Sequence, residues 1–113
     1  MKFLVVVLLL ALLCLGSSPD VVVYPGAVVN EEASKSVRKS NADNIAYTTG
    51  DAFEKVDAFY KTVGSEDVPH SRNISADMKY VVLRFPGKKF QVQLSWVPAD
   101  KRHGMLIQFV QRP

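Results

Sequence analysis

The stretch KYVVLRFPGKKFQVQLSW, residues 79–96, decides the fold because its apolar side chains recur at every second position. A period of two is typical of a β-strand with one buried face. Pro86 and Gly87 interrupt the pattern and favour a tight turn. The stretch therefore predicts two antiparallel strands. Their apolar faces would consist of Val81, Leu83, Phe85, Phe90, Val92, Leu94 and Trp96.

The same alternation returns near the end of the chain, where Met105, Ile107 and Phe109 lie at every second position. Three consecutive strands with one apolar face need a covering layer. Residues 52–63 can supply it as a helix, with Asp51 and Glu54 as a capping box and Gly64 as the terminating residue. The apolar stripe of this expected helix is Phe53, Val56, Phe59, Tyr60 and Val63.

The first part of the chain predicts a hairpin. Residues 24–27, Tyr-Pro-Gly-Ala, have the composition of a type II turn, and Val28-Val29 begins an extended segment that becomes polar and reaches residue 39. A turn over 40–44 and a return strand over 45–49 complete the hairpin, and residues 64–77 read as a surface connection. The expected fold is a two-layer α+β domain, with one amphipathic helix on an antiparallel sheet of about five strands in the order β-β-α-β-β-β.

The beginning of the chain predicts export. Lys2 precedes an apolar run over residues 3–15, which is too short for a membrane span of about 20 residues and is followed by small residues. We expect a secretory signal peptide over 1–16 and a single small domain over 17–113. Cleavage after Ser18 also satisfies the small-residue rule but places Pro19 at the cut. A bacterial lipid anchor on Cys14 is not expected, because Leu13 stands where a small residue is required.

Cleavage after Gly16 would leave 97 residues without a cysteine, so the domain would depend on its core and not on disulfides. The net charge of the full chain is +3, and its cations are scattered. This pattern is not typical of nucleic-acid binding. After cleavage no transmembrane span is expected, and the protein would be periplasmic or extracellular.

The order of three short motifs gives the chain a resemblance to a known group. Residues 24–27 (YPGA), the strand end Tyr47-Thr48-Thr49 and a helix with Val56, Phe59 and Tyr60 resemble a small module of uncharacterised bacterial extracytoplasmic proteins and lipoproteins. The resemblance covers residues 22–110. It departs from that group at Gly64-Ser65, where a Gly-Trp pair is frequent, and at Leu13. It implies no known activity, and it leaves a ligand contact at Tyr24 or Tyr60 as the alternative to a packing role.

The chemistry-bearing residues do not form a catalytic pattern. His70 and His103 are the two histidines and lie in separate loops without metal-ligand spacing, so no metal or other cofactor is expected. The serines lack a Gly-x-Ser-x-Gly context. The carboxylates of residues 31–32 and 66–67 are adjacent pairs in polar stretches. We therefore expect a protein that is not an enzyme.

A binding surface is the remaining candidate site. If the apolar faces of the strands pack under the helix, the opposite face carries apolar, amide and cationic side chains, a mixture suited to a partner. The predicted partner surface consists of Tyr80, Val82, Arg84, Gln91, Gln93 and Gln108. A second candidate is the cationic loop of Lys101, Arg102 and His103, and Lys88-Lys89 occupies another turn. Successive meander turns alternate ends, so these two cationic groups should lie apart.

The expected function is that of a non-catalytic exported envelope protein, structural or protein-binding, whose partner is another envelope protein. The alternative is a carrier that holds a small apolar or lipid ligand between helix and sheet. This alternative depends on the supply of large aromatic side chains, namely Phe53, Phe59, Tyr60, Phe85, Phe90, Trp96 and Phe109. The same side chains could fill a solid core instead.

Overall fold

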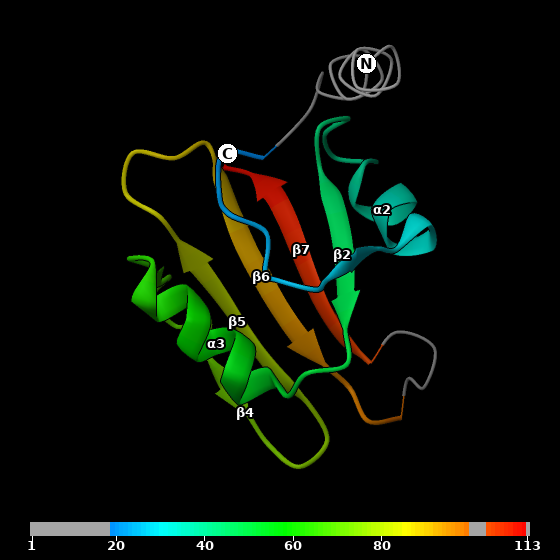
Figure 1. The fold of residues 1–113 in the computed structure, drawn as a ribbon, viewed down its shortest axis with the longest axis vertical. Helices are drawn as coiled ribbons and strands as arrows, with labels where there is room; N and C mark the ends of the chain where they lie inside the picture. Colours follow the sequence, from blue (N-terminus) through cyan, green and yellow to red (C-terminus); the bar gives the residue numbers. More distant parts are fainter. Residues whose placement is uncertain (1–18, 100–103, 113) are drawn as a thin grey trace, which may run out of the picture.

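The computed structural model describes residues 19–99 and 104–112 and has an α+β fold (Figure 1). Four long strands dominate the chain: β2 (Ile45–Thr49), β5 (Lys79–Arg84), β6 (Phe90–Trp96) and β7 (Met105–Gln111). Three further strands have two residues each: β1 (Val28–Val29), β3 (Glu66–Asp67) and β4 (Asn73–Ile74). The helices in this part of the chain are α2 (Glu31–Val37) and α3 (Phe53–Thr62).

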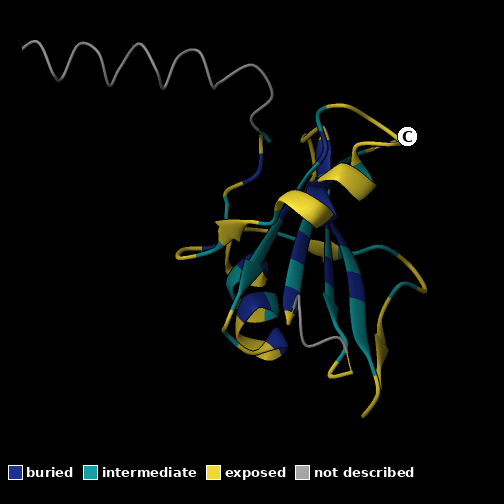
Figure 2. Ribbon diagram, turned by 90° about the vertical axis from the view of Figure 1, so that its right-hand side faces the viewer, coloured by how far each residue is buried: buried dark blue, intermediate teal, exposed yellow. Residues whose placement is uncertain are grey.

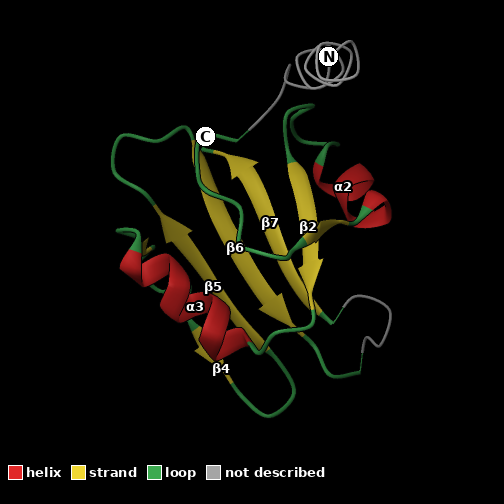
Figure 3. Cartoon of the chain, in the orientation of Figure 1, coloured by secondary structure: helices red, strands yellow, loops and turns green. Residues whose placement is uncertain are grey.

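The strands form one open antiparallel sheet in the order β1-β2-β7-β6-β5-β3, and β4 also pairs with β5. The predicted α+β class is confirmed. The predicted five-stranded sheet and the order β-β-α-β-β-β are wrong, because the sheet is larger and a second helix follows β1. β7 lies between β6 and β2, so the last strand of the chain joins the meander to the N-terminal hairpin (Figure 3).

One face of the sheet carries the core, as the alternation predicts. Buried and partly exposed residues alternate along β5, β6 and β7 (Figure 2). α3 covers this face with Phe53, Val56 and Tyr60, all of which are buried. The segment before β1 also covers it, because Val21 and Tyr24 belong to the same core cluster. The covering layer is therefore α3 together with an N-terminal segment, and not the helix alone.

The main correction concerns residues 30–39, where the sequence predicts a polar continuation of a strand. The structure has α2 there, beginning after Asn30, whose side chain accepts a hydrogen bond from the N–H of Ala33 at 2.8 Å. Glu31 and Glu32 in the first turn favour a helix because its N-terminal end carries a partial positive charge. The capping residue and the two carboxylates thus account for a helix in a stretch with few apolar residues.

The predicted helix over 52–63 is confirmed with slightly shorter bounds, but its predicted cap is wrong. Ala52 occupies the N-cap position and forms no side-chain capping bond. Asp51 instead accepts a hydrogen bond from the hydroxyl of Tyr24. Gly64 adopts a φ of 95°, as the predicted stop requires, whereas Val63 is 43 % exposed and lies outside the apolar stripe.

The two predicted turns that need glycine are present. The N–H of Ala27 bonds to the carbonyl of Tyr24 at 3.1 Å, and Gly26 has a φ of 83°. The turn between β5 and β6 has Gly87 at a φ of 80°. The connection over 64–77 is more ordered than predicted, because it contributes β3 and β4 to the sheet edge.

Across residues 19–99 and 104–112, neither helix is long and apolar enough to cross a membrane. The predicted signal peptide and the cationic loop residues Lys101, Arg102 and His103 lie outside the described residues.

Candidate functional site

The face of the sheet opposite α3 brings together the six residues of the predicted partner surface. Tyr80, Val82 and Arg84 alternate with the buried residues of β5, and Gln91, Gln93 and Gln108 alternate with those of β6 and β7. We call this surface, with Ser95, Leu106 and Val110, the open face. Five of the six predicted residues are half-buried and Arg84 is exposed, as expected for a sheet surface in contact with solvent.

The strand register aligns these side chains in rows across the sheet. Val82 lies opposite Gln93, Gln93 opposite Gln108, and Gln108 opposite Ala46 of β2. Side chains directly opposite each other on one face have Cβ atoms about 5 Å apart. The row ends at Ala46, which is fully buried beside α2, so α2 bounds the open face at the β2 edge.

Three glutamines dominate the chemistry of the open face. In the described part of the chain, the carboxamides of Gln91, Gln93 and Gln108 form no hydrogen bond with another residue. None of their polar atoms is buried without a partner, so they reach solvent. Each carboxamide provides two donors and an acceptor. The open face can therefore hydrogen-bond both donors and acceptors of a partner.

A hollow of about 380 Å³ lies at one end of the open face. It adjoins Gln91, Gln93 and Val110, and residues from the turn before β2 and from the end of β7 complete it. The Asn44 side chain has a structural role there, because its amide donates to the carbonyl of Val37 and its oxygen accepts from the N–H of Gln111. The residues that sequence reasoning missed are Ser40, Asn41, Asn44, Gln111 and Arg112.

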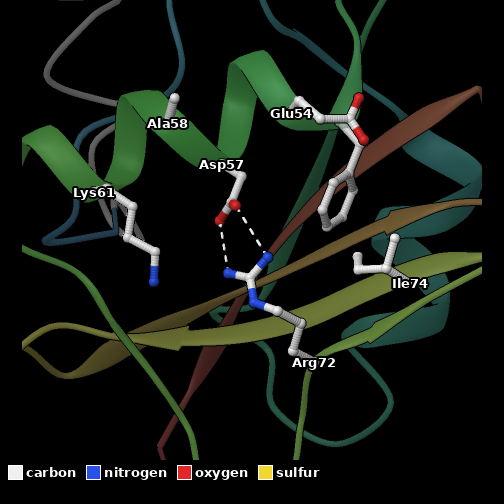
Figure 4. A pocket seen from close by; sticks show the side chains of 7 residues that line it. Glu54, Asp57, Ala58, Lys61, Arg72 and Ile74 are labelled. Atoms are coloured by element: carbon white, nitrogen blue, oxygen red, sulfur yellow. Dashed lines mark hydrogen bonds and ion pairs between the residues drawn. The ribbon is translucent and has the colours of Figure 1, made fainter.

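A second hollow, of about 500 Å³, lies between α3 and β4 and is strongly charged (Figure 4). Arg72 binds Asp57 through two hydrogen bonds of 3.0 and 3.1 Å, and it also binds both oxygens of Asp67. Lys61 contacts Asp67 as well. Hydrogen bonds from Arg72 hold the pKa of Asp67 well below its usual range. Burial raises this pKa, and the hydrogen bond from Lys61 lowers it further. The opposite charges in this cluster neutralise one another. Its ion pairs attach the β3–β4 connection to α3.

A third hollow, of about 470 Å³, adjoins Tyr24 and Asp51. Their mutual hydrogen bond is the first cause of both pKa shifts: it raises the pKa of Tyr24 and lowers that of Asp51. Lys55 lies 3.6 Å from the same carboxylate. Tyr60, the other tyrosine considered for a ligand contact, is fully buried and donates to the carbonyl of Val22 at 2.9 Å. Both tyrosines have packing and hydrogen-bonding roles that account for them.

Side chains that could bind a metal ion are dispersed over the described part of the chain. No three His, Cys, Asp or Glu residues within it are grouped as metal ligands would be. His70 is exposed in the connection between β3 and β4. The open face is therefore the candidate site that the geometry favours.

Comparisons with protein families, curated proteins and solved structures gave no match to this chain. The resemblance to the small extracytoplasmic module accordingly stays a prediction.

Proposed function

We propose that this protein is a non-catalytic exported module that binds another envelope protein through the open face. The observation that supports this proposal is the group of three glutamine carboxamides on a sheet surface that neither α2 nor α3 covers. Such a surface offers hydrogen-bonding groups beside apolar contact area from Val82, Leu106 and Val110. Interfaces commonly combine these two components.

The same observations favour a binding module over a ligand carrier. The aromatic side chains on which a carrier would depend belong to the hydrophobic core or pack against it. Tyr60 packs edge-on against Phe59 and Phe85, with ring centroids 5.0 and 5.8 Å apart. The hollows described above lie beside α3 or on the open face. The aromatic supply is thus accounted for by core packing.

Site-specific crosslinking in envelope extracts tests the proposal. A photo-crosslinking amino acid at position 93 should give a discrete adduct with one partner protein. The matched control places the same group at Thr62, which is exposed on α3 and lies on the other side of the sheet. Equal adducts at both positions, or none at position 93, would refute the role of the open face.

A pair of charge-introducing variants provides a second test. Gln93→Lys and Gln108→Lys should each weaken capture of the crosslinked partner, because a lysine ammonium cannot accept the hydrogen bonds that a carboxamide accepts. Thr62→Lys should leave capture unchanged. Turnover of a simple substrate by the purified wild-type protein, lost in the Gln93 variant, would instead indicate an enzyme.

A further inference from the structure

The chain enters the domain at one particular end of the sheet. The carboxylate of Asp20 accepts hydrogen bonds from the N–H groups of Lys89 and Phe90, at 2.7 and 3.1 Å. Phe90 begins β6, and Lys89 belongs to the turn that precedes it. Residue 19 therefore lies beside the β5–β6 turn, at the end of the sheet where β7 also finishes (Figure 1).

Hydrogen bonds bring two further segments to this end. The backbone N–H of Arg112 bonds to the carbonyl of Lys89 at 2.9 Å, and its guanidinium bonds to that of Lys88 at 3.2 Å. The guanidinium of Arg38 bonds to the carbonyl of Asn44, and the side chain of Asn44 accepts from Gln111. The end of α2, the β5–β6 turn and the end of β7 are thereby held together.

This end of the domain carries an excess of positive charge. We call it the cationic end, and its exposed cations are Arg38, Lys39, Lys88, Lys89 and Arg112. The carboxylates within the same segments are Asp20 and Asp43. Arg84 and Glu66 also lie at this end but pair with each other at 3.4 Å. Of these cations, the sequence pattern predicts only Lys88 and Lys89 as a cationic group. Arg38 and Arg112 come close to them because of the strand order, which the pattern does not predict.

The distance between this end and the predicted leader is limited by the length of the chain. The apolar run ends at Leu15, so residues 16–19 alone separate it from the domain. Four residues span at most about 14 Å. Before cleavage, while the apolar run is still attached and held in a membrane, the cationic end must therefore lie close to the headgroups. Charges attract over about 8–10 Å at ordinary ionic strength, so the two distances are comparable.

We propose that, before the leader is cleaved, the cationic end binds the phosphates of anionic lipid headgroups in the membrane that holds the leader. This inference depends on the exported character in the proposed function and goes beyond it by assigning a second surface. The four long strands begin or end at the cationic end, so the open face would extend away from the membrane and remain accessible to a partner. A lysine or arginine near an anionic surface strengthens membrane binding about fivefold.

Binding of the full chain to vesicles tests the proposal. Vesicles of phosphatidylcholine are compared with vesicles in which about a third of the lipid is phosphatidylglycerol. The wild-type chain should prefer the anionic vesicles, and high salt should remove the preference. Lys88→Gln/Lys89→Gln should lower the partition onto anionic vesicles about 10- to 30-fold while leaving the leader-driven binding to phosphatidylcholine unchanged.

The control removes two cations from the opposite end of the sheet. Lys79 pairs with Trp96 across β5 and β6, and Lys55 contacts Asp51 near the end of β2. Lys55→Gln/Lys79→Gln should retain most of the preference for anionic vesicles. Equal losses in the two variants would show attraction by net charge alone and overturn the proposal.

Hydrogen exchange locates the contact independently of the variants. Amides of residues 87–90 should exchange more slowly on anionic vesicles, whereas those of the 75–78 turn at the other end should not change. Protection confined to the 75–78 turn would overturn the proposal. Neither experiment involves Gln93, so failure here would leave the crosslinking result on the open face intact.

Discussion

At the scale of single residues, the hydroxyl of Tyr60 connects α3 to the N-terminal segment. It donates to the carbonyl of Val22 at 2.9 Å, and the ring is fully buried. Tyr60→Phe should lower the free energy of unfolding by about 1 kcal/mol, because the carbonyl loses its partner while the packing stays. Urea denaturation measures this change.

Tyr80→Phe is the matched control for that experiment. Tyr80 is half-buried on the open face, and its hydroxyl bonds to no other described residue. Its loss should change the free energy of unfolding by less than about 0.5 kcal/mol. Equal losses in the two variants would contradict the role assigned to the Tyr60 hydroxyl.

Asp67 links stability to pH. Hydrogen bonds from Arg72 hold its pKa in the folded protein below the value of about 3.9 for an unfolded chain. A lowered folded-state pKa gives stability that is complete above the unfolded value and is lost as the pH falls below it. The midpoint of unfolding, measured at a series of pH values, should therefore decrease as the pH is lowered from about 5.

Asp67→Asn removes this ionisation. The variant should be less stable than wild type at neutral pH and should lose less stability on acidification. Asp77→Asn, at an exposed carboxylate with no ion pair among the described residues, should follow the wild-type curve. Parallel acid curves for wild type and Asp67→Asn would refute the linkage.

At the scale of elements, the two helices begin in opposite ways. α2 has a capping side chain, Asn30, whereas Ala52 at the N-cap of α3 forms no capping bond. Asn30→Ala should cost about 1 kcal/mol, and Ala52→Ser should stabilise the protein by about 0.5–1 kcal/mol. Thermal unfolding of both variants measures the two effects, and shifts of the same sign would contradict the assignment of the caps.

The elements also differ in how far the sequence predicts them. β5, β6, β7 and α3 repeat their apolar residues with the period of their own geometry, so short-range patterns identify them. α2 lacks such a repeat, and its stability depends on Ser34, which bonds to both backbone groups of Ala46 in another element. The two-residue strands β3 and β4 exist because β5 lies beside them. Strand pairing that depends on a distant segment cannot be recognised from the local sequence pattern.

At the scale of the whole molecule, strand order determines which parts open first. β6 and β7 each pair along both sides, whereas β1, β3 and β4 lie at the margins with two residues each. Amides of β6 and β7 should exchange with solvent slowest and require global unfolding, and those of β1 and β4 should exchange fastest. Native-state hydrogen exchange measures this ranking. Amides of β1 as protected as those of β6 would contradict it.

The candidate site shows the same limit of sequence reasoning at this larger scale. Alternation alone places Gln91, Gln93 and Gln108 on one face once the other face is assigned to the core. Asn41 and Arg112 are far apart in the sequence, and they adjoin the same hollow because β7 inserts between β2 and β6. Knowledge of the non-local pairing is needed to bring them together.

The contact between Ser34 and Ala46 has a consequence for self-association. A strand edge with unpaired backbone N–H and C=O groups is a template on which other chains can add strands. The serine hydroxyl, together with the bond from the N–H of Asn30 to the carbonyl of Ala46, occupies the groups that β2 would otherwise present there. Melting of one seven-residue helix would uncover them, so the persistence of α2 protects the protein against fibre growth.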